Sequence, residues 1–232
     1  MFVPLGDQNP IKRIRFQYVT VSLILANVVI FLLEAGVGGD QAIIASFAVI
    51  PRELFQMLAH GGAVIDTGQA IAFPERATLL SYMFVHGDLI HLVGNMLFLW
   101  VFGDNVEDDM GHWRFLAFYL ACGIIAGATH ALIMPGSNVA LIGASGAVSG
   151  VVVAYLMLHP KVRVWVLAFK ILPLNITAAW ALGLWIAFQV SMVFLPQVGP
   201  TAWWAHIGGL IAGALLTPLM KHPEVPLFGR TR

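Results

Sequence analysis

Residues 143–158 read GASGAVSGVVVAYLML, a small Gly-x-Ser-Gly turn that opens an uninterrupted apolar run. Gly146 and Gly150 lie four residues apart, a spacing that is typical of close packing between membrane helices. Ser145 is therefore either one more small packing residue or a nucleophile, and the tetrapeptide alone favours packing. The rest of the chain decides between these interpretations.

The composition is that of a membrane protein. Of the 232 residues, 59% are hydrophobic and 10% are charged, whereas soluble domains carry about 25% charged residues. The formal net charge is zero, so no nucleic-acid partner is expected. The single cysteine, Cys122, lies in an apolar run, which excludes an intramolecular disulfide and indicates a small buried hydrophobe.

Six apolar runs predict an all-α membrane protein with six transmembrane helices. They are residues 18–33, 89–102, 115–134, 142–158, 176–195 and 202–220. The first is interpreted as an uncleaved span and not as a signal peptide, because no clear small-x-small cleavage site follows it. The second and fourth must recruit flanking residues to reach the ~20 residues of a full span. Residues 162–172 are expected to form an interfacial hairpin or an extension of a span.

A long connection, residues 34–80, follows the first span. Its apolar pieces at 42–50 and 54–58 predict a short amphipathic segment that lies in the membrane interface. The expected organisation is an N-terminal segment 1–17, a six-helix membrane domain 18–221 and a C-terminal tail 222–232.

The distribution of basic residues predicts that both termini are cytoplasmic. With six spans, ten of the twelve Lys and Arg residues lie inside, and only Arg52 and Arg76 lie outside. The ten inside are Lys12, Arg13, Arg15, Arg114, Lys161, Arg163, Lys170, Lys221, Arg230 and Arg232.

Polar residues inside spans are functional candidates by default. His91 and Asn95 lie in the first turns of the second span, Ser145 opens the fourth and His206 lies in the second turn of the sixth. With this topology, all four lie within roughly 5 to 10 Å of the outer ends of their helices, given a rise of 1.5 Å per residue. Three distant segments thus bring their polar residues to one depth, which predicts a shared site.

Within that site, Ser145 and His206 are expected to act as nucleophile and general base. Gly209 and Gly213 repeat the small-residue spacing, so the fourth and sixth helices would approach closely and bring the two side chains together. Taken alone, His206 is equally well interpreted as a histidine that meets the headgroup region.

Donors for an oxyanion are available at the same depth. The backbone N–H of Ser145 opens a helix, and His91 and Asn95 lie four residues apart on one helix face. Asp88 would either orient one of the histidines or begin its helix as a carboxylate favoured by the dipole. His86 and His112 are expected in loops or at the interface. The sequence lacks His-Glu-x-x-His, and neither a metal nor a cofactor is predicted.

Four blocks of the chain resemble the rhomboid intramembrane serine proteases. Residues 86–95 (HGDLIHLVGN) are similar to the second-helix His-x-x-x-Asn motif, and residues 103–111 (GDNVEDDMG) to the cytoplasmic turn that follows it. Residues 143–146 are similar to the Gly-x-Ser-Gly nucleophile motif, and residues 205–213 (AHIGGLIAG) to the sixth-helix Ala-His-x-x-Gly-x-x-x-Gly. All four occur in order, and the resemblance covers nearly the whole chain.

The resemblance implies a Ser145–His206 dyad without a catalytic acid, with His91, Asn95 and the Ser145 amide lining the oxyanion hole. It also implies a rhomboid-like bundle whose long first outer loop is partly embedded in the membrane. The implied substrates are single-span membrane proteins, which enter near the second and fifth helices and are cut near the outer face. The compact six-span form resembles prokaryotic members, so the cytoplasmic membrane is expected.

The chain departs from some members of the family at two places. The Trp-Arg pair of the first loop is missing near Ala77 and Thr78, and Ser149 stands where those members carry an aromatic residue that stacks on the histidine. His206 must therefore be held by another group.

Three functions remain open at this point. The favoured one is an active intramembrane serine protease, and the alternative is a non-catalytic rhomboid-like protein that binds membrane clients. A small transporter ranks last, because its polar residues would lie near the midplane and its sequence would contain an inverted repeat. The identity of the substrate and the oligomeric state are left open.

Overall fold

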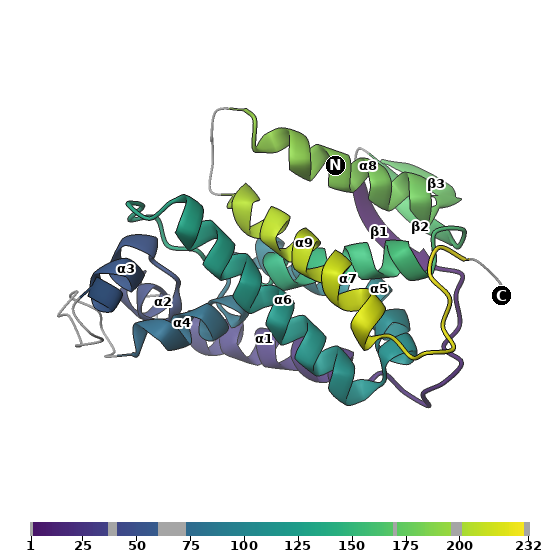
Figure 1. Ribbon diagram of the computed structural model, residues 1–232, viewed down its shortest axis with the longest axis horizontal. Coiled ribbons are helices and arrows are strands. Elements are labelled where there is room, and N and C mark those ends of the chain that lie inside the picture. Colours follow the sequence, from purple (N-terminus) through teal and green to yellow (C-terminus); the bar gives the residue numbers. More distant parts are fainter. Residues whose placement is uncertain (1, 37–40, 60–72, 169–170, 196–200, 230–232) are drawn as a thin grey trace.

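The computed structural model describes residues 2–36, 41–59, 73–168, 171–195 and 201–229. Parts of the long first connection, together with Lys170, Arg230 and Arg232 of the basic-residue count, lie outside these ranges. Within them the chain is mostly helical (Figure 1).

Four helices are long and apolar enough to cross a membrane: α1 (Tyr18–Gly36), α5 (Leu89–Met110), α6 (His112–Ile133) and α9 (Trp203–Met220). Two further apolar helices, α7 (Ser145–Leu158) and α8 (Ala178–Met192), have 14 and 15 residues. All six coincide with apolar runs of the sequence. The chain is therefore an integral membrane protein with a helical core.

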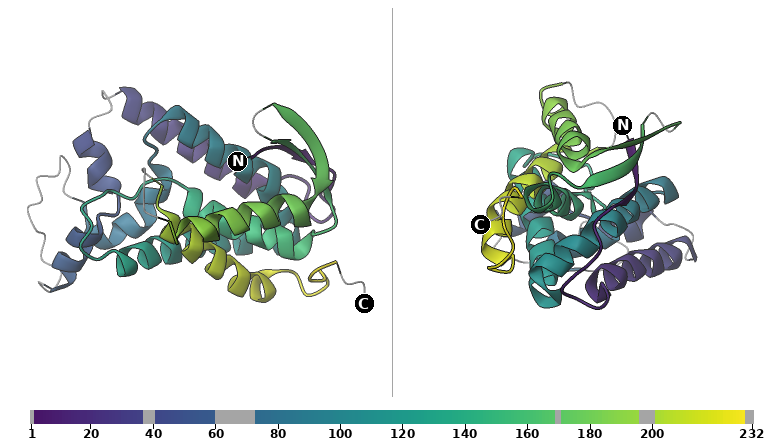
Figure 2. Two further views of the ribbon diagram at one scale, coloured as in Figure 1. Left: turned by 90° about the horizontal axis from the view of Figure 1, so that it is seen from above. Right: turned by 90° about the vertical axis from the view of Figure 1, so that its right-hand side faces the viewer.

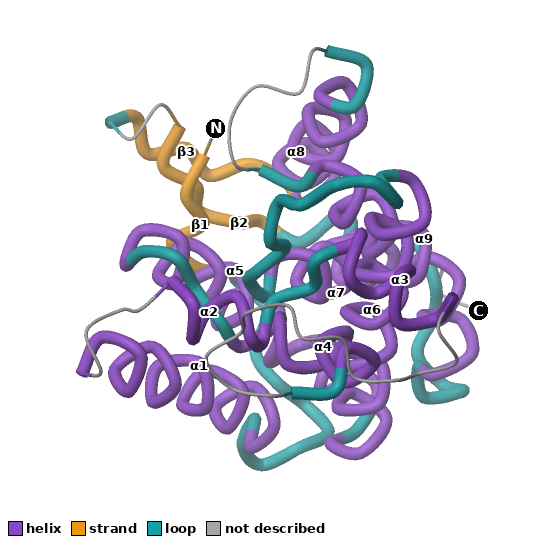
Figure 3. The backbone as a smooth tube through the Cα atoms, turned by 90° about the vertical axis from the view of Figure 1, so that its left-hand side faces the viewer, coloured by secondary structure: helices purple, strands orange, loops and turns teal. Residues whose placement is uncertain are grey.

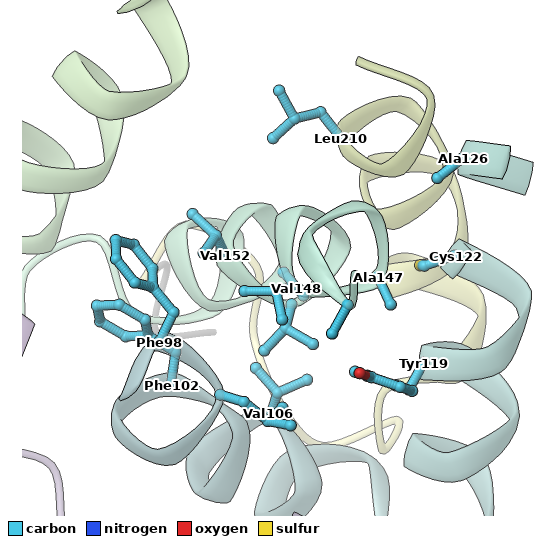
Figure 4. Close-up of a cluster of buried hydrophobic side chains, with 14 of the residues drawn as sticks. Phe98, Phe102, Val106, Tyr119, Cys122, Ala126, Ala147, Val148, Val152 and Leu210 are labelled. Carbon is cyan, nitrogen blue, oxygen red and sulfur yellow. The ribbon is translucent and has the colours of Figure 1, made fainter. Parts of the chain in front are cut away.

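Helix α7 forms the centre of the bundle, with α5, α6, α8 and α9 packed around it. It is apolar on every face, as expected of a helix that other helices enclose. Figure 4 shows Val148 and Val152 of α7 among Phe98 and Phe102 of α5, with Leu210 of α9 on another side. Helix α1 packs mainly against α5 and is largely exposed, which suits a helix that faces lipid.

One end of the bundle is fixed by hydrogen-bond acceptors at the end of α5. The Glu107 carboxylate accepts the N–H groups of Val19 (3.0 Å) and Thr20 (2.8 Å), so it satisfies the free donors at the start of α1. The Asp109 carbonyl accepts the N–H of His222 beyond α9. The segments that flank the bundle therefore meet at the same end of α5.

These contacts explain why α5 extends beyond the expected span. The predicted turn at residues 103–111 is helical to Met110, and only Gly111 turns the chain, with φ 79°. This positive φ favours glycine because a side chain would clash with the backbone. Helix α6 begins at the next residue.

A three-stranded antiparallel sheet requires a correction to the all-α prediction. Strand β1 (Phe2–Asp7) pairs with β2 (Arg163–Ala168), which pairs with β3 (Leu172–Thr177), and Phe2 lies opposite Ala168. Of the two interpretations of residues 162–172, the structure therefore contains the hairpin. The sheet was missed because its first strand is supplied by the distant N-terminal segment. The sheet lies beside α8 and α5 (Figure 2).

The first connection and the residues just after it form short helices at the end of the bundle away from the sheet (Figure 1), and Figure 3 views the molecule from that side. They are α2 (Gln41–Phe47), α3 (Pro51–Ala59), α4 (Glu75–Ser81) and the 3-10 turn η1 (Tyr82–Phe84). A short antiparallel bridge joins Val49 to Leu141 in the loop before α7. This bridge ties the first connection to the turn that carries Ser145.

Candidate active site

Ser145 and His206 face each other across the contact between α7 and α9. Ser145 is the first residue of α7, and His206 lies in the first turns of α9. His206 Nε2 is 2.9 Å from Ser145 Oγ, within hydrogen-bond distance. Two residues separated by 61 positions in the chain thus meet as a hydroxyl and a possible base.

Glycines let the backbones of these two helices touch. A Cβ atom added at Gly209 would lie 1.9 Å from the carbonyl oxygen of Gly146, and one added at Gly213 would lie 2.5 Å from that of Gly150. No larger residue fits at either position without moving a helix, because backbone atoms cannot turn aside as side chains do. The small-residue spacing is therefore linked to the short distance between Ser145 and His206.

The turn before Ser145 packs against α5. Gly143 has φ 104°, and its N–H donates to the Tyr82 carbonyl at 2.8 Å. A Cβ atom at Gly143 would lie 2.6 Å from His91 Nε2 and 3.6 Å from Asn95 Nδ2. Glycine is thus required both by the backbone conformation and by the two side chains that lie against the turn.

His86 lies beside this site, whereas the sequence predicted only a loop or interface residue. It lies in the loop before α5, as expected, but it is only 1% exposed. Its Nε2 lies 3.1 Å from Asn95 Nδ2 and accepts the Ala144 N–H at 3.4 Å. Burial lowers the pKa of His86 to about 4, with a smaller contribution from His91. A neutral His86 can accept both hydrogen bonds and so fixes Asn95 beside the turn.

Gln189 is the second residue that the sequence did not single out. It lies on α8, is 1% exposed, and places Oε1 2.8 Å from His206 Nδ1. The indole ring of Trp203 meets the His206 ring edge to face, with centroids 5.7 Å apart. Ser149 does not brace the histidine, since its hydroxyl donates to the Ser145 carbonyl at 2.7 Å.

Asp88 begins helix α5. Its Oδ1 accepts the His91 N–H at 2.8 Å, which is the N-cap arrangement. Of the two predicted roles of Asp88, orienting a histidine or beginning its helix, the structure shows the second. Within the part of the chain that the structure describes, no group of three or more His, Cys, Asp or Glu residues could hold a metal ion.

The geometry provides the parts needed for acyl transfer. A hydroxyl lies within reach of an imidazole whose other nitrogen is hydrogen-bonded, the arrangement that activates a serine. The N–H of Ser145 belongs to the first turn of a helix, where backbone donors have no partner within the helix. The side chains of His91 and Asn95 lie against the same turn.

Comparisons with known proteins converge on one family. The Rhomboid domain family matches residues 74–223, which include α5 to α9. RHOMBOID-like protein 5 of Arabidopsis thaliana is 33% identical over 142 residues, covering 61% of this chain and 43% of the relative. Rhomboid protease GluP of Bacillus subtilis is 29% identical over 194 residues, covering 79% of this chain and 36% of the relative. RHOMBOID-like protein 6, mitochondrial, of Arabidopsis thaliana is 27% identical over 217 residues, covering 86% of this chain and 67% of the relative. The chain thus spans less than half the length of the first two.

Proposed function

The chain belongs to the rhomboid family, and from this premise we propose that it is an intramembrane serine endopeptidase that hydrolyses peptide bonds in or near transmembrane segments. The observation that carries the proposal is the 2.9 Å contact between Ser145 Oγ and His206 Nε2. A relative named as a rhomboid protease, GluP of Bacillus subtilis, supports the same activity.

In the proposed reaction, Ser145 Oγ attacks the carbonyl carbon of the scissile bond while its proton passes to His206 Nε2. The C–N bond then breaks, and His206 returns the proton to the leaving amine. The acyl group remains on Ser145 as an ester. Water attacks this ester, with His206 again acting as the base, and releases the acid product and the free serine.

The developing oxyanion needs donors that are already in position. We assign this role to the Ser145 N–H, the His91 ring and the Asn95 amide. Asn95 Nδ2 carries two hydrogens, so one can bond to His86 and the other can reach the oxyanion. Neutral His86 supports this arrangement because it accepts and does not compete as a donor.

The proposed substrates are single-span membrane proteins. A stable helix hides its carbonyl groups in internal hydrogen bonds, so the substrate must unwind before attack. The site lies near the N-terminal ends of α5, α7 and α9, where small or helix-breaking substrate residues would expose a carbonyl near the membrane surface.

We further propose that the domain 18–221 crosses the membrane six times, with segment 1–17 and tail 222–232 both cytoplasmic. The short helices α7 and α8 would complete their spans with flanking residues, and the first loop would be partly embedded in the outer leaflet. The basic-residue count supports this orientation. We propose the cytoplasmic membrane of a prokaryote as the location; named relatives include mitochondrial proteins.

The test is cleavage of a single-span reporter by purified protein in liposomes. Wild type is compared with Ser145→Ala and His206→Ala, and with Ser191→Ala as a matched control, because Ser191 is exposed on α8. Wild type and the control are expected to cut, and both dyad variants to lose nearly all activity. Cleavage by Ser145→Ala would show that the nucleophile is another residue. A wild type that binds reporters without cutting any of them would support the client-binding alternative.

A further inference from the structure

We propose that Gln189 of α8 is a positioning residue that holds His206 in the orientation and tautomer that the reaction requires. This inference rests on the proposed function. It is carried by the 2.8 Å contact between Gln189 Oε1 and His206 Nδ1, which is shielded from solvent because Gln189 is 1% exposed. The contact lies on the side of the ring opposite Ser145.

The chemistry of imidazole determines what this contact does. Neutral imidazole carries one proton, and the nitrogen without it is the base. For His206 Nε2 to accept the Ser145 proton, the resting proton must be on Nδ1. An oxygen acceptor at Nδ1 favours that tautomer and fixes the rotation of the ring. Gln189 thus performs with a neutral amide the orienting task that a carboxylate performs in a Ser-His-Asp triad.

The contact gains strength during the reaction. Once Nε2 has taken the serine proton, the ring is an imidazolium and Nδ1–H is a charged donor. Hydrogen bonds to charged groups are stronger than neutral ones. Gln189 therefore stabilises the charged intermediate state more than the resting state, which accelerates the chemical step.

Neighbouring groups do not replace Gln189. Trp203 packs its ring against His206 but meets it edge to face at 5.7 Å, which limits rotation without selecting a tautomer. Ser149 bonds to the Ser145 carbonyl. Among the residues that the structure describes, the titratable side chains that lie near His206 on other helices are His91 of α5 and His130 of α6.

Two substitutions separate positioning from mere packing. Gln189→Leu keeps the volume and removes the acceptor, whereas Gln189→Glu keeps an oxygen at the same reach and adds a negative charge. Ser191→Ala on the same helix is the matched control. For each purified protein in liposomes, kcat and KM for reporter cleavage and the rate of Ser145 labelling by a fluorophosphonate are measured from pH 5 to 9, together with the thermal unfolding midpoint.

Gln189→Leu is expected to lower kcat and the labelling rate about 10- to 100-fold with KM nearly unchanged, as for the loss of one hydrogen bond to a charged group. Gln189→Glu is expected to retain activity at high pH. The acid limb of its pH–rate profile should move to higher pH. A carboxylate beside Nδ1 favours the imidazolium, and protonated His206 cannot act as a base.

Wild-type rates and an unshifted acid limb in both variants would overturn the inference. So would equal losses in both variants that follow a fall in the unfolding midpoint, since that pattern indicates packing alone. Wild-type protein that neither cuts nor is labelled at Ser145 would overturn the proposed function itself. That result is distinct, because it appears before any change at Gln189 is made.

Discussion

Replacing Gly209 by alanine tests whether backbone contact between α7 and α9 sets the distance between Ser145 and His206. The added Cβ would lie 1.9 Å from the Gly146 carbonyl oxygen, whereas even a 3.0 Å contact is unusually short. The helices must therefore separate by at least about 1 Å at this point, since the overlap involves backbone atoms that cannot rotate away. Gly146 follows Ser145 directly, so the displacement occurs beside the dyad.

A separation of this size breaks the hydrogen bond. The 2.9 Å distance between Ser145 Oγ and His206 Nε2 would become about 4 Å, beyond hydrogen-bond reach. A misplacement of about 1 Å can cost a hundredfold in rate. We expect Gly209→Ala to lower reporter cleavage and fluorophosphonate labelling at least about 100-fold. Overpacking should also lower the free energy of unfolding by about 1 to 3 kcal/mol.

Two matched glycine variants control for the loss of stability. Gly183→Ala on α8 adds a Cβ with no atom within 4 Å, so activity and stability should stay near those of wild type. Gly213→Ala clashes with Gly150, but seven residues beyond His206, so it should lower stability and spare more of the activity. A Gly209→Ala variant as active as Gly183→Ala would refute the proposed link between backbone contact and the dyad. The link would also be refuted if Gly209→Ala and Gly213→Ala were equally stable and Gly209→Ala were no less active.

Three further predictions concern buried or half-buried polar groups. Glu107→Gln leaves donors of α1 without a carboxylate and should lower the free energy of unfolding by about 2 kcal/mol, measured by thermal unfolding in detergent. The control, Glu224→Gln at an exposed position, should change the free energy of unfolding by less than about 0.5 kcal/mol. Burial raises the pKa of Asp7 above 3.8 despite its hydrogen bond from Tyr155, so its stabilising contribution is lost as the pH rises through the raised pKa. Asp7→Asn should become progressively more stable than wild type over that range. Because the folded pKa of His86 is about 4 against 6.5 in the unfolded chain, stability should fall by up to about 3 kcal/mol as the pH drops through this window, and His86→Phe should lack this slope.

The six apolar helices follow closely from the sequence, because each coincides with an apolar run that is recognised without its neighbours. The ends of the elements do not. Helix α5 continues through its acidic residues, where the Glu107 carboxylate and the Asp109 backbone carbonyl accept hydrogen bonds from distant segments. Strand β1 forms only because β2 lies beside it, and its pairing partner is some 160 residues away in the chain. Such features depend on contacts that no local pattern encodes.

The residues of the candidate site also differ in how far the sequence alone predicts them. Ser145 and His206 carry chemistry in their side chains and occur in small-residue motifs, so the sequence predicts both as candidates before any distance is known. His86 differs, because a loop histidine gives no sign of burial. Its role becomes visible only when Asn95 and the Ala144 N–H are seen to share its Nε2.

The sequence also carries a signal for Gln189. The predicted site takes its polar residues only from the spans that run from outside to inside. With the predicted topology, the fifth span, residues 176–195, runs from inside to outside, so a residue near its C-terminal end is expected at the depth of Ser145. Gln189 is six residues from that end, roughly 9 Å at the helical rise. Under that topology, polar residues near the C-terminal ends of alternate spans are candidates for the same site.

The dyad is constrained along two independent coordinates by two different parts of the chain. Glycine contacts between α7 and α9 set the separation of Ser145 and His206 through the backbone, whereas Gln189 on α8 sets the rotation and proton position of the ring. A stacked aromatic ring limits rotation but cannot select a tautomer, since its face offers no directed acceptor comparable to an amide oxygen. Ser149 supplies no ring at this position, so in this chain His206 is held by the Trp203 ring on α9 and by the Gln189 amide on α8.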